Sequence, residues 1–147
     1  MGNVRERIRM SDAEIAAFLD AAHTLHVASI NSDGTPHLVP MWFLRDGDTV
    51  QFWTYAKSQK VVNLQRDPRC TVMAEAGLAY GDLHGVSISG RAEIIEDRAR
   101  VMEFGNAMGA KYFSEDADAV DLEAMGAKRV LVVIHPERVT SWDHRKI

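Results

Sequence analysis

The sequence has little of several features that would define a class of protein. It holds one cysteine, Cys70, in 147 residues, which excludes a disulfide within the chain and is typical of a reducing cytoplasm. Its apolar runs, such as 130–134, are far shorter than the ~20 residues of a membrane span. The N-terminal stretch MGNVRERIRM lacks the apolar core of a signal peptide. We therefore expect a cytoplasmic protein without a membrane segment.

Positive charge and the common site motifs are also scarce. The formal net charge is −4 and the pI is about 5.8, whereas nucleic-acid-binding domains usually present a basic face. There is no CxxC, HExxH, G-x-S-x-G or P-loop, and the histidines complete no set of metal ligands. We therefore expect no nucleic-acid partner and no bound metal. The sequence pattern does not indicate which residues are catalytic.

What is present is a pattern of short strands in one domain spanning residues 1–147. Ser11 and Glu14 form a capping box before an amphipathic helix. Further helices are predicted over 58–66 and 97–112, with a less regular one after Ser114. Alternation and turn signals predict strands over 25–30, 37–44, 49–55, 69–76, 86–96 and 129–142.

The order of these elements indicates a mainly β, α+β fold. Too few long helices separate the strands for a parallel sheet. A small antiparallel barrel is the better interpretation because closing a sheet removes its edges. Gly90 interrupts a long strand and predicts a bend or bulge there.

The stretch WTYAKSQKVVNLQRDPR, 53–69, is a first candidate site. It joins a strand to a helix, whose N-terminus offers unpaired N–H groups and a partial positive charge to an anion. Ser58 is placed to cap the helix or to bind the anion, and Thr54 at the strand end can reach the same space. Lys60 stands in the first turn, where a cation is unfavourable unless an anion offsets it. The alternative is an ordinary capped helix with solvated Lys57 and Lys60.

Two aromatic segments are further candidates. In PHLVPMWF, 36–43, Pro40 removes a ladder hydrogen bond and belongs at an edge or bulge. Such a kink can bring Met41 and Trp42 against a flat ligand. The alternative is that Trp42 and Phe43 belong to the core or to a dimer contact. Near the C-terminus, Trp142 either belongs to a frayed end or closes on a ligand or a partner subunit.

Three motifs resemble those of the split β-barrel flavoproteins related to pyridoxamine 5′-phosphate oxidase, and especially the branch that uses the deazaflavin coenzyme F420. They are LHVASINSDGTPHLVPMWF, FWTYAKSQKVVNLQRDPR and VSISGRAEIIED. The second is the most specific. The similarity runs from about residue 13 to 142. It implies a six-stranded antiparallel split β-barrel with flanking helices, forming a homodimer with cofactors at the subunit interface.

The resemblance also assigns roles to residues. Ser58 and Lys60 would bind the cofactor phosphate near Thr54, with Lys57 available to an anionic tail. Asn63 would hold the helix against the barrel. The remaining cofactor-binding residues would line the ring or come from the partner subunit: Val39, Pro40, Met41, Trp42 and, from the partner, Trp142.

The function implied is an F420H2-dependent oxidoreductase that passes a hydride to a small unsaturated or activated substrate. The proton would come from water or from a nearby residue such as His84 or Tyr55. The alternatives are an FMN-binding oxidoreductase of the same fold, or a non-catalytic flavin or haem binder with His37 or His84 as the axial ligand. Pyridoxamine-phosphate oxidases have a basic residue where this chain has Gln59, and a longer C-terminal segment, so vitamin B6 oxidation is not expected.

Overall fold

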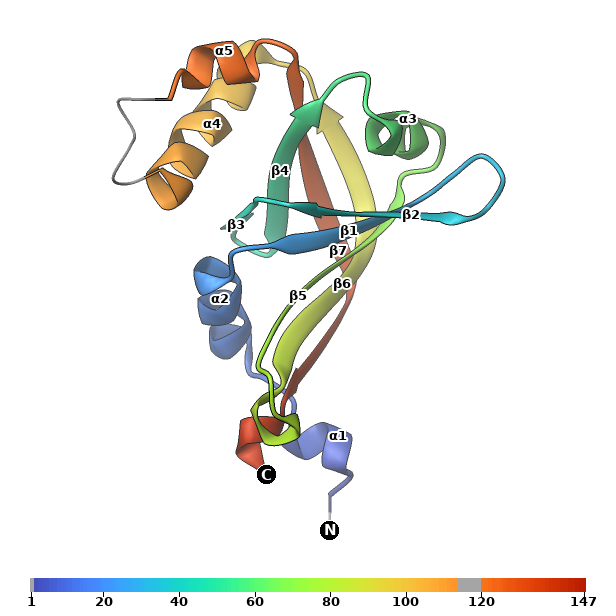
Figure 1. Cartoon of the computed structure of the whole chain (residues 1–147). Coiled ribbons are helices and arrows are strands. Elements are labelled where there is room, and N and C mark those ends of the chain that lie inside the picture. The colour runs from blue at the N-terminus through green and yellow to red at the C-terminus, as the bar shows by residue number, and fades with distance from the viewer. Residues whose placement is uncertain (1, 114–119) are drawn as a thin grey trace.

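The computed structural model describes residues 2–113 and 120–147. In these ranges the strands are β1 Leu25–Ile30, β2 Pro36–Met41, β3 Leu44–Asp46, β4 Thr49–Tyr55, β5 Arg69–Ala76, β6 His84–Ile95 and β7 Arg129–Asp143. They form one antiparallel sheet in the order β2-β1-β5-β6-β7-β4-β3, which curls into a half-barrel (Figure 1). The expected split-barrel fold is confirmed.

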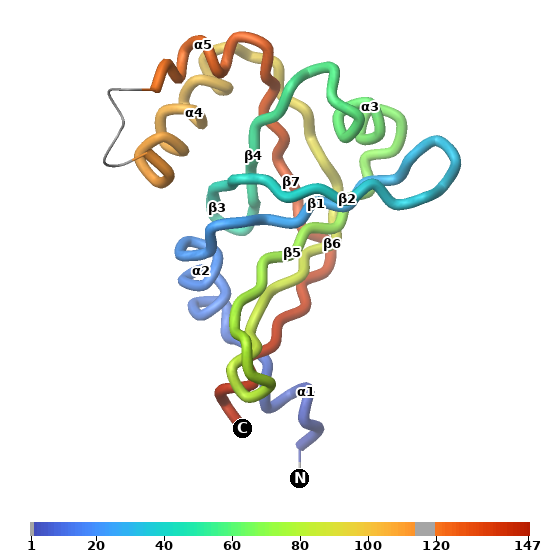
Figure 2. The backbone as a smooth tube through the Cα atoms, viewed as in Figure 1, coloured from blue at the N-terminus to red at the C-terminus, as the bar shows by residue number. Residues whose placement is uncertain are grey.

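Helices flank this sheet at both ends. They are α1 Val4–Arg7, α2 Asp12–Ala21, α3 Gln59–Arg66, α4 Arg98–Tyr112 and α5 Leu122–Gly126, with 3-10 turns at Tyr80–Asp82 and His144–Lys146. The chain trace shows α3, α4 and α5 around one end of the half-barrel (Figure 2). At the other end β5, β6 and β7 continue as a twisted arm toward the two termini. None of the described helices is long and apolar enough to cross a membrane.

The described residues form seven strands where the resemblance implied six. The expected strand 37–44 is divided because Trp42 and Phe43 leave the sheet. The backbone N–H of Phe43 instead donates to the Tyr112 hydroxyl at 3.1 Å, and α4 thereby contacts the link between β2 and β3. The less regular helix expected after Ser114 corresponds to α5, which begins at Leu122. The part of that prediction on residues 114–119 lies outside the described ranges.

Alternation along β4 separates two apolar cores. Val50 and Phe52 point into the half-barrel. Trp53 points outward and packs with Phe104 of α4. Cys70 lies in the half-barrel core, and burial raises the pKa of its thiol to about 12. Cys70 is therefore an uncharged core residue and not a nucleophile.

The bend expected at Gly90 is confirmed. The pairing of β6 with β7 shifts register between Ser89 and Gly90, as in a β-bulge. The two backbones approach so closely that a Cβ on Gly90 would lie 2.0 Å from the His135 carbonyl oxygen. A glycine is required here because a backbone atom cannot move aside as a side chain can.

We predict that Gly90→Ala lowers the free energy of unfolding by about 3 kcal/mol, the range of overpacking at a constrained site. Urea denaturation followed by circular dichroism measures the change. Gly81→Ala is the matched control, because a Cβ at Gly81 meets no atom within 4 Å. Equal stability of the two variants would show that the strands at Gly90 separate without cost.

Candidate functional site

Two cavities among the described residues have predicted site residues in their walls. The larger, of about 1180 Å³, lies between α1, α2 and β7. The smaller, of about 570 Å³, lies where β4 ends, between α3 and α4. Its walls are His23, Thr24, Pro40, Met41, Trp42, Trp53, Thr54, Tyr55, Lys60, Met108, Met125 and Arg129.

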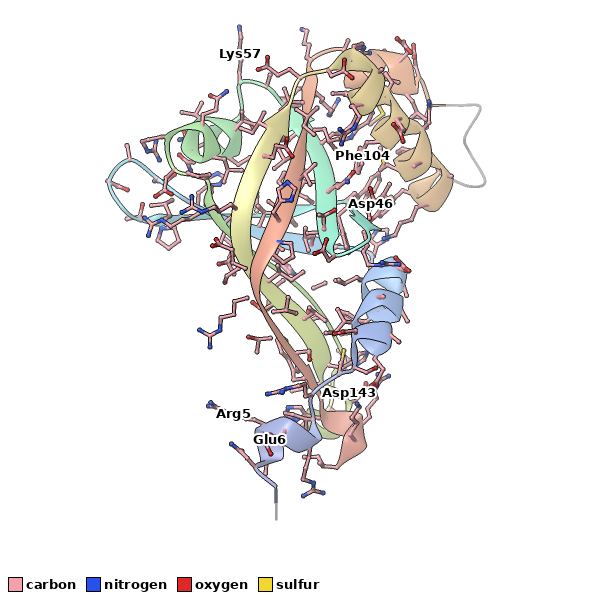
Figure 3. All side chains as sticks on the ribbon, turned by 180° about the vertical axis from the view of Figure 1, so that it is seen from behind. Arg5, Glu6, Asp46, Lys57, Phe104 and Asp143 are labelled. Carbon is pink, nitrogen blue, oxygen red and sulfur yellow. The ribbon has the colours of Figure 1, made fainter. Side chains whose placement is uncertain are left out.

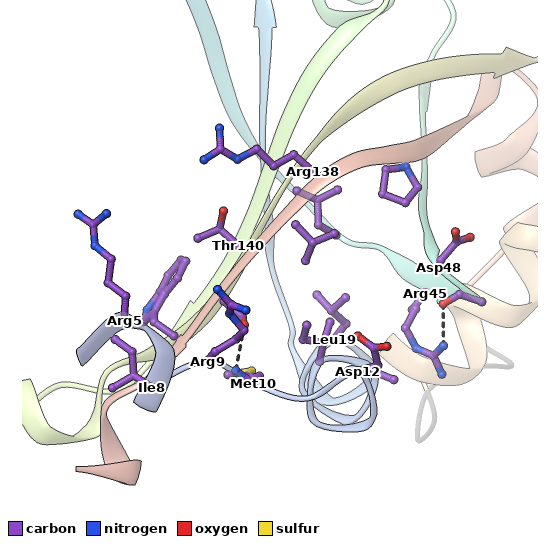
Figure 4. A pocket seen from close by; sticks show the side chains of 18 residues that line it. Arg5, Ile8, Arg9, Met10, Asp12, Leu19, Arg45, Asp48, Arg138 and Thr140 are labelled. Carbon is purple, nitrogen blue, oxygen red and sulfur yellow. Dashed lines mark hydrogen bonds between the residues drawn. The ribbon is translucent and has the colours of Figure 1, made fainter. Parts of the chain in front are cut away.

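The larger cavity holds Trp142 and none of the other predicted residues. Its lining includes the buried apolar side chains Leu19 and Ile88. It also includes arginines from α1, from the segment after it and from β7, namely Arg5, Arg9 and Arg138 (Figure 4). The Trp142 ring lies against Gly85, where an added Cβ would be 2.6 Å from Cζ2. Within one chain, then, Trp142 is not part of the cofactor site that the resemblance implied.

The smaller cavity brings together Pro40, Met41, Trp42, Thr54 and Lys60. These residues come from β2, the segment after it, β4 and α3, so segments distant in the sequence meet here. We refer to this cavity as the β4-end pocket. Because it gathers most of the predicted residues, we take it as the candidate site.

Three predicted residues stand outside the walls of this pocket. Val39 is half-buried and packs against the half-barrel core. The Lys57 side chain is exposed and extends away from the molecule (Figure 3). Ser58 lies two residues before Lys60 at the N-cap of α3.

The side chains of Lys60 and Ser58 have hydrogen-bond donors that an anion could use. Lys60 Nζ donates to Thr54 Oγ1 at 2.8 Å and, among the described residues, makes no salt bridge with a carboxylate. Burial lowers the pKa of Lys60, because a cation without a counterion loses solvation. Ser58 Oγ is buried, makes no capping bond to α3 and has no hydrogen-bond partner within the described ranges. A phosphate at this helix start would satisfy both groups.

A buried amide holds α3 in place beneath these residues. Asn63 is 0% exposed, and its Nδ2 donates to Ser29 Oγ at 3.1 Å and to Asn31 Oδ1 at 2.9 Å. Its Oδ1 accepts from Gln59 Nε2 at 2.8 Å and from Arg66 Nη2 at 3.1 Å. The expectation that Asn63 fixes the helix to the barrel is confirmed.

An aromatic wall closes another side of the pocket. Trp42, which is 40% exposed, stacks on Tyr112 of α4 with ring centroids 4.6 Å apart and planes 12° from parallel. The Tyr112 hydroxyl donates to the His23 carbonyl at 2.8 Å, which fixes the ring. Phe43, by contrast, is fully buried. Of the roles considered for this segment, that of a core residue applies to Phe43. Trp42 instead lines the pocket, with its ring stacked on Tyr112.

Arg129 is a pocket residue that sequence reasoning missed. It begins β7 and pairs with Tyr55 at the end of β4. Its guanidinium carbon lies 4.2 Å from the centroid of the Tyr55 ring and 5.5 Å from that of Trp53. Among the described residues, the pocket walls therefore include two cations, Lys60 and Arg129, and no Asp or Glu.

The histidines proposed for other roles lie elsewhere. His84 Nδ1 is 2.7 Å from the Asp82 carbonyl oxygen and its ring packs on Phe18, at the start of β6. His37 lies on β2, and its Nδ1 is buried without a hydrogen-bond partner in the part of the chain that the structure describes. Neither lines the β4-end pocket, whereas Tyr55 does. The described residues bring no three His, Cys, Asp or Glu side chains together as a metal site.

Comparison with known proteins adds to this geometry. Residues 11–143 match the family model described as pyridoxamine 5′-phosphate oxidase. A conserved hypothetical protein, Rv2991, from Mycobacterium tuberculosis has 41% identity and a TM-score of 0.91, over 99% of this chain and 92% of that chain. No curated protein sequence matches the chain.

Two other solved structures are similar at lower identity. A structure named F420 reductase has 24% identity and a TM-score of 0.70, over 84% of this chain and 94% of that chain. The heme storage protein HutZ from Vibrio cholerae has 15% identity and a TM-score of 0.71, over 88% and 94%. At these identities the two likenesses show the fold alone.

We predict that Asn63→Ala lowers the free energy of unfolding by about 3 kcal/mol, because it strands several buried polar groups. Gln65→Ala is the control, since Gln65 is exposed on the same helix. Urea denaturation of both variants measures the difference. If Asn63→Ala is as stable as Gln65→Ala, the amide does not hold α3.

Proposed function

Because the chain belongs to the pyridoxamine 5′-phosphate oxidase family of flavin-binding oxidoreductases, we propose that it is an F420H2-dependent reductase. The observation that carries the proposal is the β4-end pocket. It combines a flat aromatic face at Trp42 with an uncompensated cation at Lys60. These are the features that a ring with a phosphorylated side chain requires.

Each part of the ligand has residues to hold it. The phosphate would accept hydrogen bonds from Lys60 Nζ and Ser58 Oγ, with Thr54 keeping the lysine in position. The ring would lie along β2 and the segment after it, against Pro40, Met41 and Trp42. When bound, the reduced deazaflavin supplies a hydride to the substrate.

Gln59 supports the deazaflavin over a vitamin B6 oxidase. Its side-chain amide donates to Asn63, so it serves the helix anchor. The position that holds a basic residue in pyridoxamine-phosphate oxidases is therefore structural here, and the other cation of α3, Arg66, lies in its last turn and not beside Lys60. The name F420 reductase, carried by a protein of the same fold, agrees with this choice.

The chain's own residues define the environment of the substrate. The pocket is lined mainly by apolar and aromatic side chains, which suits a small unsaturated or activated organic molecule. Tyr55, whose hydroxyl-bearing ring lines the pocket, is our candidate for proton delivery. His84 lies too far along the arm to serve within one chain. We keep the cytoplasm as the expected location, where Cys70 stays a thiol.

The proposal is tested by titrating the purified protein with F420 and, in parallel, with FMN, each followed by fluorescence. We expect F420 to bind more tightly, by at least tenfold. Tight binding of FMN with no binding of F420 would contradict the proposal and favour an FMN-dependent oxidoreductase of the same fold.

Removing the Lys60 amine should weaken phosphate binding. A charge-assisted hydrogen bond contributes about 1.5–3 kcal/mol, so Lys60→Ala should weaken FMN binding roughly tenfold to a hundredfold. Riboflavin, which has the same ring and no phosphate, should bind the variant as it binds the wild type. Lys57→Ala is the matched lysine control, with an expected change of less than about threefold for an exposed, screened charge. Unchanged FMN affinity in Lys60→Ala would remove Lys60 from the site.

The same contact should depend on pH. Burial holds the pKa of Lys60 below the ordinary 10.5, so its charge is present below that lowered pKa and is lost as the pH rises through it. The ratio of FMN to riboflavin affinity should fall in the wild type as the pH rises through this lowered pKa. In Lys60→Ala the ratio should stay level. A flat ratio in the wild type would contradict the role of the lysine cation.

We also propose that the chain forms a homodimer with the pocket at the subunit interface. The outer face of β2, β1, β5 and β6 carries a patch of short and apolar side chains, in which Leu38 is 66% exposed. Its members are His26, Ala28, Leu38, Pro40, Thr71, Met73, Ser87 and Ser89, aligned by the strand pairing. The charged residues of the same face, Arg69, Glu75 and Arg91, lie toward the ends of β5 and β6 and border this patch. Pro40 also lines the pocket, so a partner on this face would reach the cofactor.

Light scattering after size exclusion tests the dimer. The wild type should have twice the 16.4 kDa of one chain, and Leu38→Asp, which places a charge on the proposed interface, should shift it toward the monomer. Val62→Asp is the control, because Val62 is 45% exposed on α3, outside this face. A monomeric wild type would contradict the proposal.

A further inference from the structure

Arg129 has no part in the phosphate contact proposed for Lys60 and Ser58, yet it lines the same pocket. Its position follows from the sheet. The ladder between β4 and β7 ends with Tyr55 opposite Arg129, and the Ala56 N–H donates to the Lys128 carbonyl at 3.0 Å just beyond. The backbone at this corner is therefore fixed on both strands, and the Arg129 side chain starts from a rigid point.

The guanidinium itself is held in place without being neutralised. It lies over the Tyr55 ring at 4.2 Å, and Nη1 donates to the Met125 carbonyl. Its other nitrogens make no hydrogen bond to a described residue, and no carboxylate of the described part of the chain forms a salt bridge with it. An arginine stacked in this way is oriented for a planar, bidentate anion.

Arg129 and Lys60 reach the pocket from opposite sides of β4. Successive side chains of a strand point to opposite faces. Lys60 is hydrogen-bonded to Thr54, whereas Arg129 stacks on Tyr55, the next residue. The Lys60 ammonium and the Arg129 guanidinium therefore lie on opposite faces of β4. This arrangement suits two separate anionic groups better than a single phosphate held between the two cations.

We infer that Arg129 binds a second anionic group of the ligand, a carboxylate or phosphate distinct from the phosphate at Lys60. This inference rests on the proposed function and makes it more specific. The pocket then favours a ligand whose side chain carries two or more anions, because a ligand with a single phosphate gains the Lys60 contact alone. Arg129 is then the residue that distinguishes the two classes of cofactor.

Four probes separate the two anion-binding points. F420 carries a phosphodiester and further carboxylates, and its matched neutral probe is 8-hydroxy-5-deazariboflavin, with the same ring. FMN carries one phosphate, and its neutral match is riboflavin. The affinity of each is measured by fluorescence titration for the wild type, Arg129→Gln and Lys60→Ala, so the readout is binding and not turnover.

We expect Arg129→Gln to weaken F420 binding about tenfold or more, the loss of one charge-assisted contact. The affinities of Arg129→Gln for FMN and for the two neutral probes should stay within about twofold of those of the wild type, a difference too small for a lost ionic contact. Arg129→Lys should recover only part of the F420 affinity, because the amine keeps the charge and loses the fork. The salt dependence of F420 binding should also be shallower in Arg129→Gln than in the wild type.

The controls keep this inference distinct from the proposed function. Arg100→Gln removes the same charge from an exposed position on α4, outside the pocket walls, and should bind F420 as the wild type does. Thermal unfolding shows whether Arg129→Gln is folded, and Arg129→Lys serves if it is not. If the wild type binds F420 and Arg129→Gln binds it equally well, this inference alone is wrong. An equal loss for FMN would show one shared anion site and also overturn it. A wild type that binds none of the four probes contradicts both proposals.

Discussion

The hydrogen bonds of Asn63 are the constraint on which the site depends. A single buried amide joins β1 to α3 through Ser29 and Asn31 and so sets where the helix begins. Because Ser58 and Lys60 lie in the cap and first turn of α3, their positions are set by a residue that touches no ligand. The same amide accepts from Gln59, which takes that side chain out of the phosphate site. The fold and the chemistry of the pocket are therefore linked through one polar group.

Much of the fold was predictable from local sequence signals. The capping box at Ser11, the strand alternation and the bend at Gly90 are all determined by neighbouring residues, and the structure confirms them. The division of the strand at Trp42 was not predictable, because it arises from the Tyr112 hydroxyl of a helix about seventy residues away. Helix α4 competes there with the sheet for the Phe43 backbone, and no local pattern records that competition.

The candidate site was predictable in part for the same reason. Thr54 and Lys60 belong to one continuous motif and are close in sequence, so the pattern alone brings them together. Arg129 joins them only through the pairing of β4 with β7, and the first residue of an apolar strand gives no sign of that role. The resemblance placed Trp142 in the cofactor site of the partner subunit, and within its own chain Trp142 lines the larger cavity. Its role at the cofactor stays a prediction.

The electrostatics of the β4-end pocket connect these points, because its walls, as far as the structure describes them, contain the two cations Lys60 and Arg129 and no carboxylate. A crystal structure of the protein with F420 tests the central claim most directly. It should show the cofactor phosphate within hydrogen-bond distance of Lys60 Nζ and Ser58 Oγ, with the ring along Pro40 and Trp42. A cofactor bound in the larger cavity between α1, α2 and β7, or a phosphate away from Lys60, would contradict the account.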